Sequence, residues 1–353
     1  MTTPHRFLTL LALVALGACA DESTSVDGAA STTTAKSLST DAAVIAVGRA
    51  IFFDDRLSLN GNQSCAACHA PAWGWTGPNA TINAGGSVYE GSIAGAFGDR
   101  KPPSSAYATQ SPILHYDGEL FEGGNFWDGR ATGERLGNPA AEQALGPFLN
   151  PAEQALPDPA SVIARICAGP YSAAFLAVAG TGACDPANTA ATYDFIGSSI
   201  AAFEASPEVN AFTSKFDHYL TGQARLTPQE HQGLGLFTGK GKCAACHVLD
   251  DMGGRRDRDR DEPRAGARRG TRALFTDFTF DNLGIPKNPV NPQGQGYTDR
   301  GLRNFLLTRG EWAALADAND GKHKVPTLRN VDKRPTPSSV KAYGHNGYFK
   351  TLV

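Results

Sequence analysis

A five-residue string, CAACH, occurs twice in the chain, at residues 65–69 and 243–247. C-x-x-C-H is the attachment site of a c-type haem, because its two thiols add to vinyl groups at one edge of the porphyrin and the histidine can then bind the iron. The sequence therefore predicts two haem c cofactors. Their attachment residues and axial iron ligands are Cys65, Cys68 and His69 for one haem and Cys243, Cys246 and His247 for the other.

Two other kinds of site also use closely spaced cysteines. A zinc knuckle needs four protein ligands close together, and neither string has a second cysteine pair or a histidine cluster near it. A thioredoxin-like redox pair belongs in a βαβ context, which the surrounding sequence does not suggest. Haem attachment is therefore the favoured interpretation of both strings.

The composition is that of a globular protein. The chain has 353 residues, of which 41% are apolar and 19% charged, enough to form two domains with separate cores. The net charge of −3 gives no reason to expect nucleic acid as a partner.

The N-terminal segment is typical of an exported protein. Residues 1–18 contain basic residues followed by an apolar run that is too short to span a bilayer, which predicts a signal peptide. Residues 16–19 (LGAC) resemble a bacterial lipoprotein box, which would leave Cys19 as a lipid anchor; ordinary cleavage beside Cys19 is the alternative. Residues 19–40 are rich in Ser, Thr and Ala and read as a flexible linker.

Helical patterns follow the linker and recur in the second half. Apolar residues at 44, 47, 51 and 52 predict a helix that ends near residue 53, and two more helices are expected around residues 161–166 and 196–203. Thr227 and Glu230 form a capping box with Pro228 at the first helical position. Residues 77–125 read as a long loop.

Two cysteines and one methionine remain after the haem strings and the N-terminus are assigned. In an oxidising compartment Cys167 and Cys184 would form a disulfide; two buried free thiols are the alternative. Apart from Met1, Met252 is the only methionine, and it lies five residues past His247. A His/Met-ligated haem is therefore disfavoured.

Several motifs, taken with the two haem strings, resemble the bacterial di-haem cytochrome c peroxidases, whose superfamily includes the MauG-like enzymes. The resemblance covers residues 41–353, and its motifs are 126–131 (FWDGRA), 142–144 (EQA), 150–153 (NPAE), 325–330 (VPTLRN) and 345–347 (HNG). It implies a mostly α-helical, periplasmic protein of two cytochrome-c-like domains with one covalently bound haem each. Residues 41–206 would be the N-terminal peroxidatic domain and 207–353 the C-terminal electron-transfer domain.

The resemblance also implies roles for single residues. Trp127 would lie between the haems, and Gln143 and Glu153 would belong to the distal pocket of the first haem. One carboxylate above the iron could move a proton from the inner to the outer oxygen of peroxide, the role assigned to Glu153; a surface or helix-start carboxylate is the alternative. The family also has a calcium ion at the domain interface, whose ligands include backbone carbonyls.

The chain departs from the family pattern at two places. A histidine sixteen residues past the first haem histidine blocks the iron in the classical peroxidases, and Gly85 stands there in this chain. We therefore expect an open first haem, with His115 as a displaced ligand in the minority interpretation. The sixth ligand of the second haem would lie about fourteen residues past His345, beyond Val353, so we expect the C-terminal domain to be truncated.

Three functions compete on this basis. The leading one is a peroxidase that reduces hydrogen peroxide to water with electrons from a small periplasmic donor, such as a cytochrome c or a cupredoxin. The second is MauG-like oxidation of a protein or organic substrate through high-valent haem. The third is a di-haem electron carrier, which predicts two six-coordinate haems and no reaction with peroxide.

Overall fold

A computed structural model describes Met1, residues 34–249 and residues 272–353. The predicted signal peptide beyond Met1, Cys19, most of the predicted linker and Met252 lie outside these residues. The described residues from 34 onward belong to one compact unit.

Helices dominate the secondary structure, which confirms the predicted mostly helical class. They are α1 (Ala42–Phe52), α2 (Cys65–Cys68), α3 (Ala80–Ala84), α4 (Pro139–Leu149), α5 (Pro159–Cys167), α6 (Ser172–Ala179), α7 (Thr189–Ala205), α8 (Lys215–Leu220), α9 (Pro228–Thr238) and α10 (Leu302–Leu306). Seven 3₁₀ turns are described: η1 (Asp55–Leu57), η2 (Pro71–Trp73), η3 (Ala108–Gln110), η4 (Pro186–Asn188), η5 (Cys243–Ala245), η6 (Ala313–Leu315) and η7 (Asp317–Asn319).

The described strands are short and pair in two antiparallel ribbons. β1 (His115–Tyr116) pairs with β2 (Phe121–Glu122), and β3 (Phe280–Asp281) pairs with β4 (His323–Lys324). A single bridge between Glu122 and Thr279 joins the two ribbons. Segments more than 150 residues apart in the sequence therefore meet through backbone hydrogen bonds.

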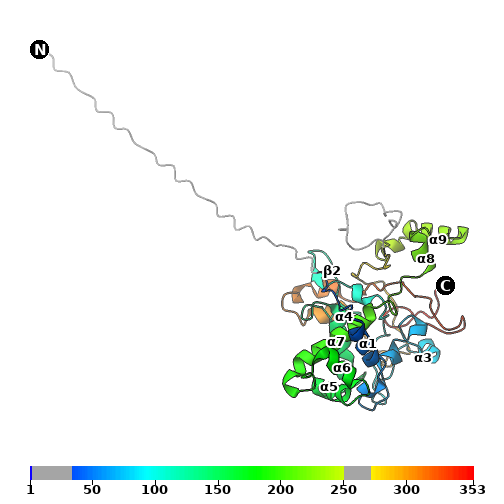
Figure 1. Ribbon diagram of the computed structural model, residues 1–353. Coiled ribbons are helices and arrows are strands. Elements are labelled where there is room, and N and C mark those ends of the chain that lie inside the picture. Colours follow the sequence, from blue (N-terminus) through cyan, green and yellow to red (C-terminus); the bar gives the residue numbers. More distant parts are fainter. Residues whose placement is uncertain (2–33, 250–271) are drawn as a thin grey trace. The chain divides into compact units, whose positions relative to one another are not determined.

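Helix α7 is the centre of the largest core and packs against α1 and α4 (Figure 1). Close packing depends on two glycines: a Cβ on Gly48 of α1 would lie 1.9 Å from Ser199 O, and one on Gly197 of α7 would lie 2.5 Å from Ala141 O. Phe52, Phe203 and Trp75 meet edge to face at 5.3–5.9 Å between ring centroids. Cys65 of the first haem string packs against this core, so α7 supports the site.

A second core cluster combines residues from both halves of the chain. Leu114 and Phe121 pack with Phe280, Leu302 and Leu306. The predicted domains 41–206 and 207–353 therefore share a hydrophobic cluster, and their boundary stays a prediction. The predicted capping box is present at α9, where Thr227 and Glu230 bond reciprocally to backbone N–H groups.

The described helices were also compared with what a membrane span requires. None of them is long and apolar enough to cross a bilayer alone; α5 and α6 reach that length and composition only as a pair, and this pair is bent by 117°.

Candidate haem sites and the residues between them

The first string places its histidine for metal binding. Cys65–Cys68 form the single turn α2, and the chain then reverses at Gly74 and Trp75, which both have positive φ. The carbonyl oxygen of Trp75 lies 3.2 Å from Nδ1 of His69. A carbonyl can only accept, so Nδ1 carries the proton and Nε2 keeps its lone pair for iron. Burial lowers the pKa of His69 to about 4, which keeps the ring neutral.

The two thiols of this string line a cavity of about 160 Å³, together with His69, Gln143 and Glu153. Burial raises the pKa of Cys68 to about 12 and raises that of Cys65 further. Both sulfurs are therefore neutral, as thioether sulfurs are. The apolar sulfurs, the neutral imidazole and the surrounding cavity fit a covalently attached haem.

Helix α4 and the turn after it supply the polar side chains of this cavity. Gln143 is on α4, and Glu153 follows the helix, where its Oε1 accepts a hydrogen bond of 3.0 Å from Asn150 Nδ2. Burial raises the pKa of Glu153, and the positive charge of Arg130 opposes part of that rise. A carboxyl group whose pKa is raised holds a proton more readily than an ordinary carboxylate does, which suits a group that accepts and then returns a proton.

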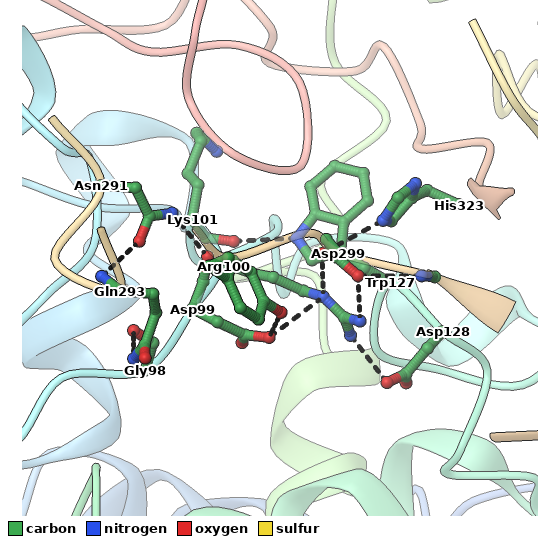
Figure 2. Close-up of polar contacts among 12 residues, drawn as sticks. Gly98, Asp99, Arg100, Lys101, Trp127, Asp128, Asn291, Gln293, Asp299 and His323 are labelled. Atoms are coloured by element: carbon green, nitrogen blue, oxygen red, sulfur yellow. Dashed lines mark hydrogen bonds and ion pairs between the residues drawn. The ribbon is translucent and has the colours of Figure 1, made fainter. Parts of the chain in front are cut away.

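Trp127 lies where the first and second cavities approach each other. Its side chain is 7% exposed and lines the cavity of the first string and also that of the second. Its indole Nε1 donates a hydrogen bond of 2.8 Å to the carbonyl oxygen of Lys101 (Figure 2). Phe126 and Gly129 have positive φ on either side of it, so the FWDGR turn holds this ring in one place.

A buried guanidinium joins the segments around Trp127. Arg100 donates to both carboxylate oxygens of Asp299 at 2.6 and 2.7 Å and to Asp128 at 2.6 Å (Figure 2). The pKa of Asp299 is lowered because hydrogen bonds from His323 and Arg100 outweigh its burial. Asn291 and Gln293 bind the backbone of Asp99 and Gly98 beside it. These contacts hold together three segments that are distant in the sequence, residues 98–101, 127–128 and 291–299, around Trp127.

The second string has the same ligand arrangement in a more open setting. Cys243–Ala245 form η5, and Nδ1 of His247 lies 2.8 Å from the carbonyl oxygen of Phe275. Cys243, Cys246 and His247 line a cavity of about 850 Å³. Cys243 is exposed, whereas Cys65 and Cys68 are half-buried. The residues fit a second covalent haem that is closer to solvent.

Two further histidines lie in the second cavity. The rings of His323 and His345 stack at 3.6 Å, and His323 Nε2 lies 3.1 Å from Asp299 Oδ2. Among the described residues, these three form the one side-chain group with metal-ligand spacing. Calcium takes oxygen ligands, and both oxygens of Asp299 already accept from Arg100, so this group does not fit calcium. The predicted calcium ion has no side-chain site here and stays a prediction.

His115 is not brought to either haem cavity. It lies on β1, where its Nδ1 is 3.0 Å from the carbonyl oxygen of Ile113, and it lines none of the cavities described in residues 34–249 and 272–353. His115 pairs with Glu122 in the β1–β2 ribbon, and the minority interpretation of His115 as a distal ligand stays a prediction. Gly85 ends α3. Cys167 and Cys184 form a disulfide between α5 and the segment after α6.

Sequence reasoning missed four ionisable residues beside the first string, three of them buried and one, Lys324, half-buried. Lys101, Lys324, Lys341 and Glu204 line one cavity of about 280 Å³ together with His69. Burial raises the pKa of Glu204 to about 8. Glu204 directly follows Phe203 within the apolar pattern of α7, and this position in the sequence indicates that its side chain is buried. Lys101 and Lys341 lie in loops and Lys324 lies on the two-residue strand β4, and nothing in their local sequence indicates burial.

Comparison with known proteins assigns the family. The sequence model of the family described as di-haem cytochrome c peroxidase matches residues 42–225. The chain is 35% identical over 315 residues to the methylamine utilization protein MauG of Paracoccus denitrificans (strain Pd 1222), covering 88% of this chain and 73% of MauG. It is 32% identical over 320 residues to the cytochrome c peroxidase Ccp of Escherichia coli (strain K12), covering 89% of this chain and 52% of Ccp.

A solved structure agrees with these matches. The diheme peroxidase BthA from Burkholderia thailandensis E264 superposes with a TM-score of 0.73 at 31% sequence identity, covering 90% of this chain and 71% of BthA. The two haem strings, the cavities around them and these similarities lead to one conclusion: the chain belongs to the di-haem cytochrome c peroxidase family and is an oxidoreductase.

Proposed function

We propose that this protein reduces hydrogen peroxide to water at the Cys65–His69 haem, using electrons that arrive through the Cys243–His247 haem. The observation that carries the proposal is that Trp127 lines the cavities of both strings. A peroxidase of this kind needs one site for the chemistry, a second site that receives electrons and a connection between them. The two cavities and Trp127 supply that arrangement.

When bound, the first haem would supply an iron with an exchangeable position and part of the electron supply. The protein's own residues handle the protons. Glu153 takes a proton from the inner oxygen of peroxide and delivers it to the outer oxygen, which leaves as water. The amide of Gln143 on α4 can hydrogen-bond the same oxygens, and Asn150 holds the Glu153 carboxyl group in place.

The second site would receive electrons from a small periplasmic redox protein, such as a cytochrome c or a cupredoxin. Its exposed Cys243 and the exposed Leu283 in the same cavity lining support this assignment, because electron exchange with a partner needs a haem edge near the surface. The first site has a carboxyl group for proton transfer, and its thiols are half-buried.

MauG-like oxidation of a protein or organic substrate is the second candidate. It is favoured by the 35% identity to MauG and by Gly85 in place of the blocking histidine. Both candidates predict a first haem that is open in the oxidised protein without reductive activation.

One series of spectra tests these functions. The oxidised protein should show high-spin haem, and hydrogen peroxide should change its absorption bands within one turnover. Steady peroxide consumption with reduced cytochrome c would then favour the peroxidase, whereas reaction without donor turnover would favour the MauG-like function. Absence of high-spin haem and of any response to peroxide would contradict both and leave the electron carrier.

We also propose a periplasmic location with a lipid anchor at Cys19, and calcium at the domain interface. The N-terminal sequence supports the first and the family resemblance supports the second. Fractionation of cells that express the wild type or Cys19→Ser tests the anchor, because the variant should move to the soluble periplasmic fraction. Metal analysis of the purified holoprotein tests calcium, for which about one ion per chain is expected.

A further inference from the structure

Three lysines line one cavity beside the first string. Lys101, Lys324 and Lys341 all border the 280 Å³ cavity that His69 and Trp127 also line. Lys101 is 9% exposed and Lys341 is 4% exposed, while Lys324 is half-buried. Ammonium groups at this depth normally have an anionic partner, because removal of a charge from water is costly.

All three ammonium groups bond to neutral oxygens instead. Lys101 Nζ donates to Thr76 Oγ1 and to the carbonyl of Pro102, both at 2.9 Å. The other two have similar partners. Lys341 Nζ donates to the carbonyls of Trp73, Asn330 and Lys333 at 3.0–3.1 Å, and Lys324 Nζ donates to Ser111 Oγ, Asn125 Oδ1 and the carbonyl of Gly124. These contacts satisfy the N–H groups without a hydrogen bond to any carboxylate.

Another buried cation in the same cavity does have a carboxylate partner. Arg329 lines it as well and is paired with both carboxylate oxygens of Asp217. None of the ion pairs described for residues 34–249 and 272–353 includes one of the three lysines, and the charges of Glu122 on Lys324 and of Asp332 on Lys341 act more weakly than burial does. The carboxyl group in the lining belongs to Glu204, which burial keeps protonated at neutral pH by raising its pKa to about 8.

Burial without a bonded carboxylate lowers the pKa values of all three lysines. Burial, with a smaller contribution from repulsion by Lys341, lowers the pKa of Lys101 to about 7, and burial also lowers the pKa of Lys324 to about 7. The pKa of Lys341 is lowered to about 8 by burial. An anion in the cavity would reverse this effect and restore the charged forms.

We propose that Lys101, Lys324 and Lys341 form a carboxylate-binding site that receives the propionate groups of the first haem. Cys65 and Cys68 line the neighbouring 160 Å³ cavity and not the lysine cavity, whereas His69 and Lys101 line both. Lys341 lines only the lysine cavity of these two, and Lys324 lines it together with the cavity of the second string. The thioether edge and the propionate edge of a c-type haem are on opposite sides of the ring. A haem attached to these cysteines and bound by His69 therefore directs its carboxylates toward the lysines.

A small organic acid would bring the same carboxylate chemistry, so the test must separate the two sources. The proposal rests on haem attachment at the first string and not on peroxide as the substrate. It is therefore measured as a reduction potential, which stays defined even in a protein without peroxidase turnover.

The experiment is spectroelectrochemical titration of the first haem in the full holoprotein. Lys101→Met and Lys341→Met should each shift its reduction equilibrium toward the oxidised form by about tenfold, which is about 59 mV for a one-electron couple, because a positive charge beside the haem favours the reduced state. Lys341→Arg should restore the wild-type potential. Lys350→Met is the matched control: Lys350 Nζ also donates to neutral oxygens, those of Asn83, Gly85 and Ser87, but it does not line the cavity.

Acetate titration of the same proteins by calorimetry separates the sources. Wild type should show no saturable binding, because the propionates already occupy the site. Saturable binding that is lost in Lys341→Met, with an unchanged potential, would overturn the propionate assignment in favour of an external acid. The carboxylate site would be overturned altogether by a second result. In that case the reduction potentials of Lys101→Met and Lys341→Met equal that of Lys350→Met, and none of the proteins binds acetate. Lys324→Gln gives an independent third variant if one of the others fails to fold.

Discussion

The two haem strings have identical residues and very different surroundings. Cys65–His69 is a helical turn packed against the α7 core, in small cavities lined by Glu153 and by Glu204. Cys243–His247 begins in a 3₁₀ turn with an exposed cysteine and borders a cavity of about 850 Å³. In both, the histidine Nδ1 faces a backbone carbonyl. The difference teaches that the motif sets attachment and ligation, while the neighbours set the chemistry.

The largest expected effect comes from removing either attachment site. Cys65→Ser with Cys68→Ser should remove one covalent haem and abolish the reaction with peroxide, because the site with the proton-transfer carboxylate is lost. Cys243→Ser with Cys246→Ser should also remove one haem but keep a first reaction with peroxide. Haem content by mass spectrometry and stopped-flow absorption measure both results. A peroxide response that survives only in the first double variant would reverse the assignment of the two sites.

Glu153→Gln should lower kcat/KM for peroxide by about 10²–10⁴-fold, the usual contribution of a general acid–base group. The raised pKa of Glu153 adds a pH signature. Since the carboxylate must be ionised to accept the first proton, wild-type activity should fall as the pH drops through that raised pKa, and the variant should lose this limb of the profile.

Glu90→Gln is the control for this change, because Glu90 is exposed and its Oε1 accepts from the backbone of Gly95. Its kcat/KM should match that of wild type. Equal losses of kcat/KM in Glu153→Gln and Glu90→Gln would contradict a role of Glu153 in proton transfer.

Trp127→Phe tests the connection between the two sites. It should slow re-reduction of the first haem by about tenfold or more, the effect of roughly 1.4 kcal/mol on a barrier, and leave the initial reaction with peroxide near the wild-type rate. Rapid-mixing spectra resolve the two phases. A slowed first phase with unchanged re-reduction would place Trp127 in the peroxide pocket and not between the haems.

The effect of Glu204→Gln should be on stability and its dependence on pH. A folded-state pKa of about 8, above the ordinary value of 4.5, means that the native state binds more protons than the unfolded state between these values. Wild-type stability should therefore fall as pH rises from about 5 to 8, and Glu204→Gln should remove this slope. Urea unfolding at several pH values should show a variant more stable than wild type at pH 8, on the order of a few kcal/mol.

Glu208→Gln serves as the comparison, because Glu208 forms an exposed ion pair with Arg49. Its free energy of unfolding should stay within about 0.5 kcal/mol of wild type at every pH. If the free energy of unfolding depends on pH equally in wild type and Glu204→Gln, the buried neutral carboxyl group is contradicted.

Much of the helical frame could be predicted because its signals are local. The apolar spacing that predicted a helix ending near residue 53 corresponds to α1, and the Thr227–Glu230 capping box begins α9. The predicted loop over 77–125 holds α3, η3 and the ribbon β1–β2 and is otherwise irregular. Short elements of this kind carry too few residues for a period to be visible.

The polar surroundings of the first string could not be predicted, because they depend on contacts across the whole chain. Lys341 reaches the carbonyl of Trp73, and Lys324 reaches Ser111 and Asn125. No local pattern marks a lysine as buried when its partners are about 200 residues away. The surroundings of His115 also depend on a tertiary contact, since its strand pairs with β2.

The ion pairs of Arg100 stabilise the region around Trp127 with a cation that belongs to the chain itself. Its guanidinium holds Asp128 beside the tryptophan and Asp299 on the far segment. A cation that is part of the polypeptide cannot be removed by a chelator, exchanged for another ion or lost on dilution. The junction at this arginine is therefore complete as soon as the chain folds, whatever the supply of divalent ions around it.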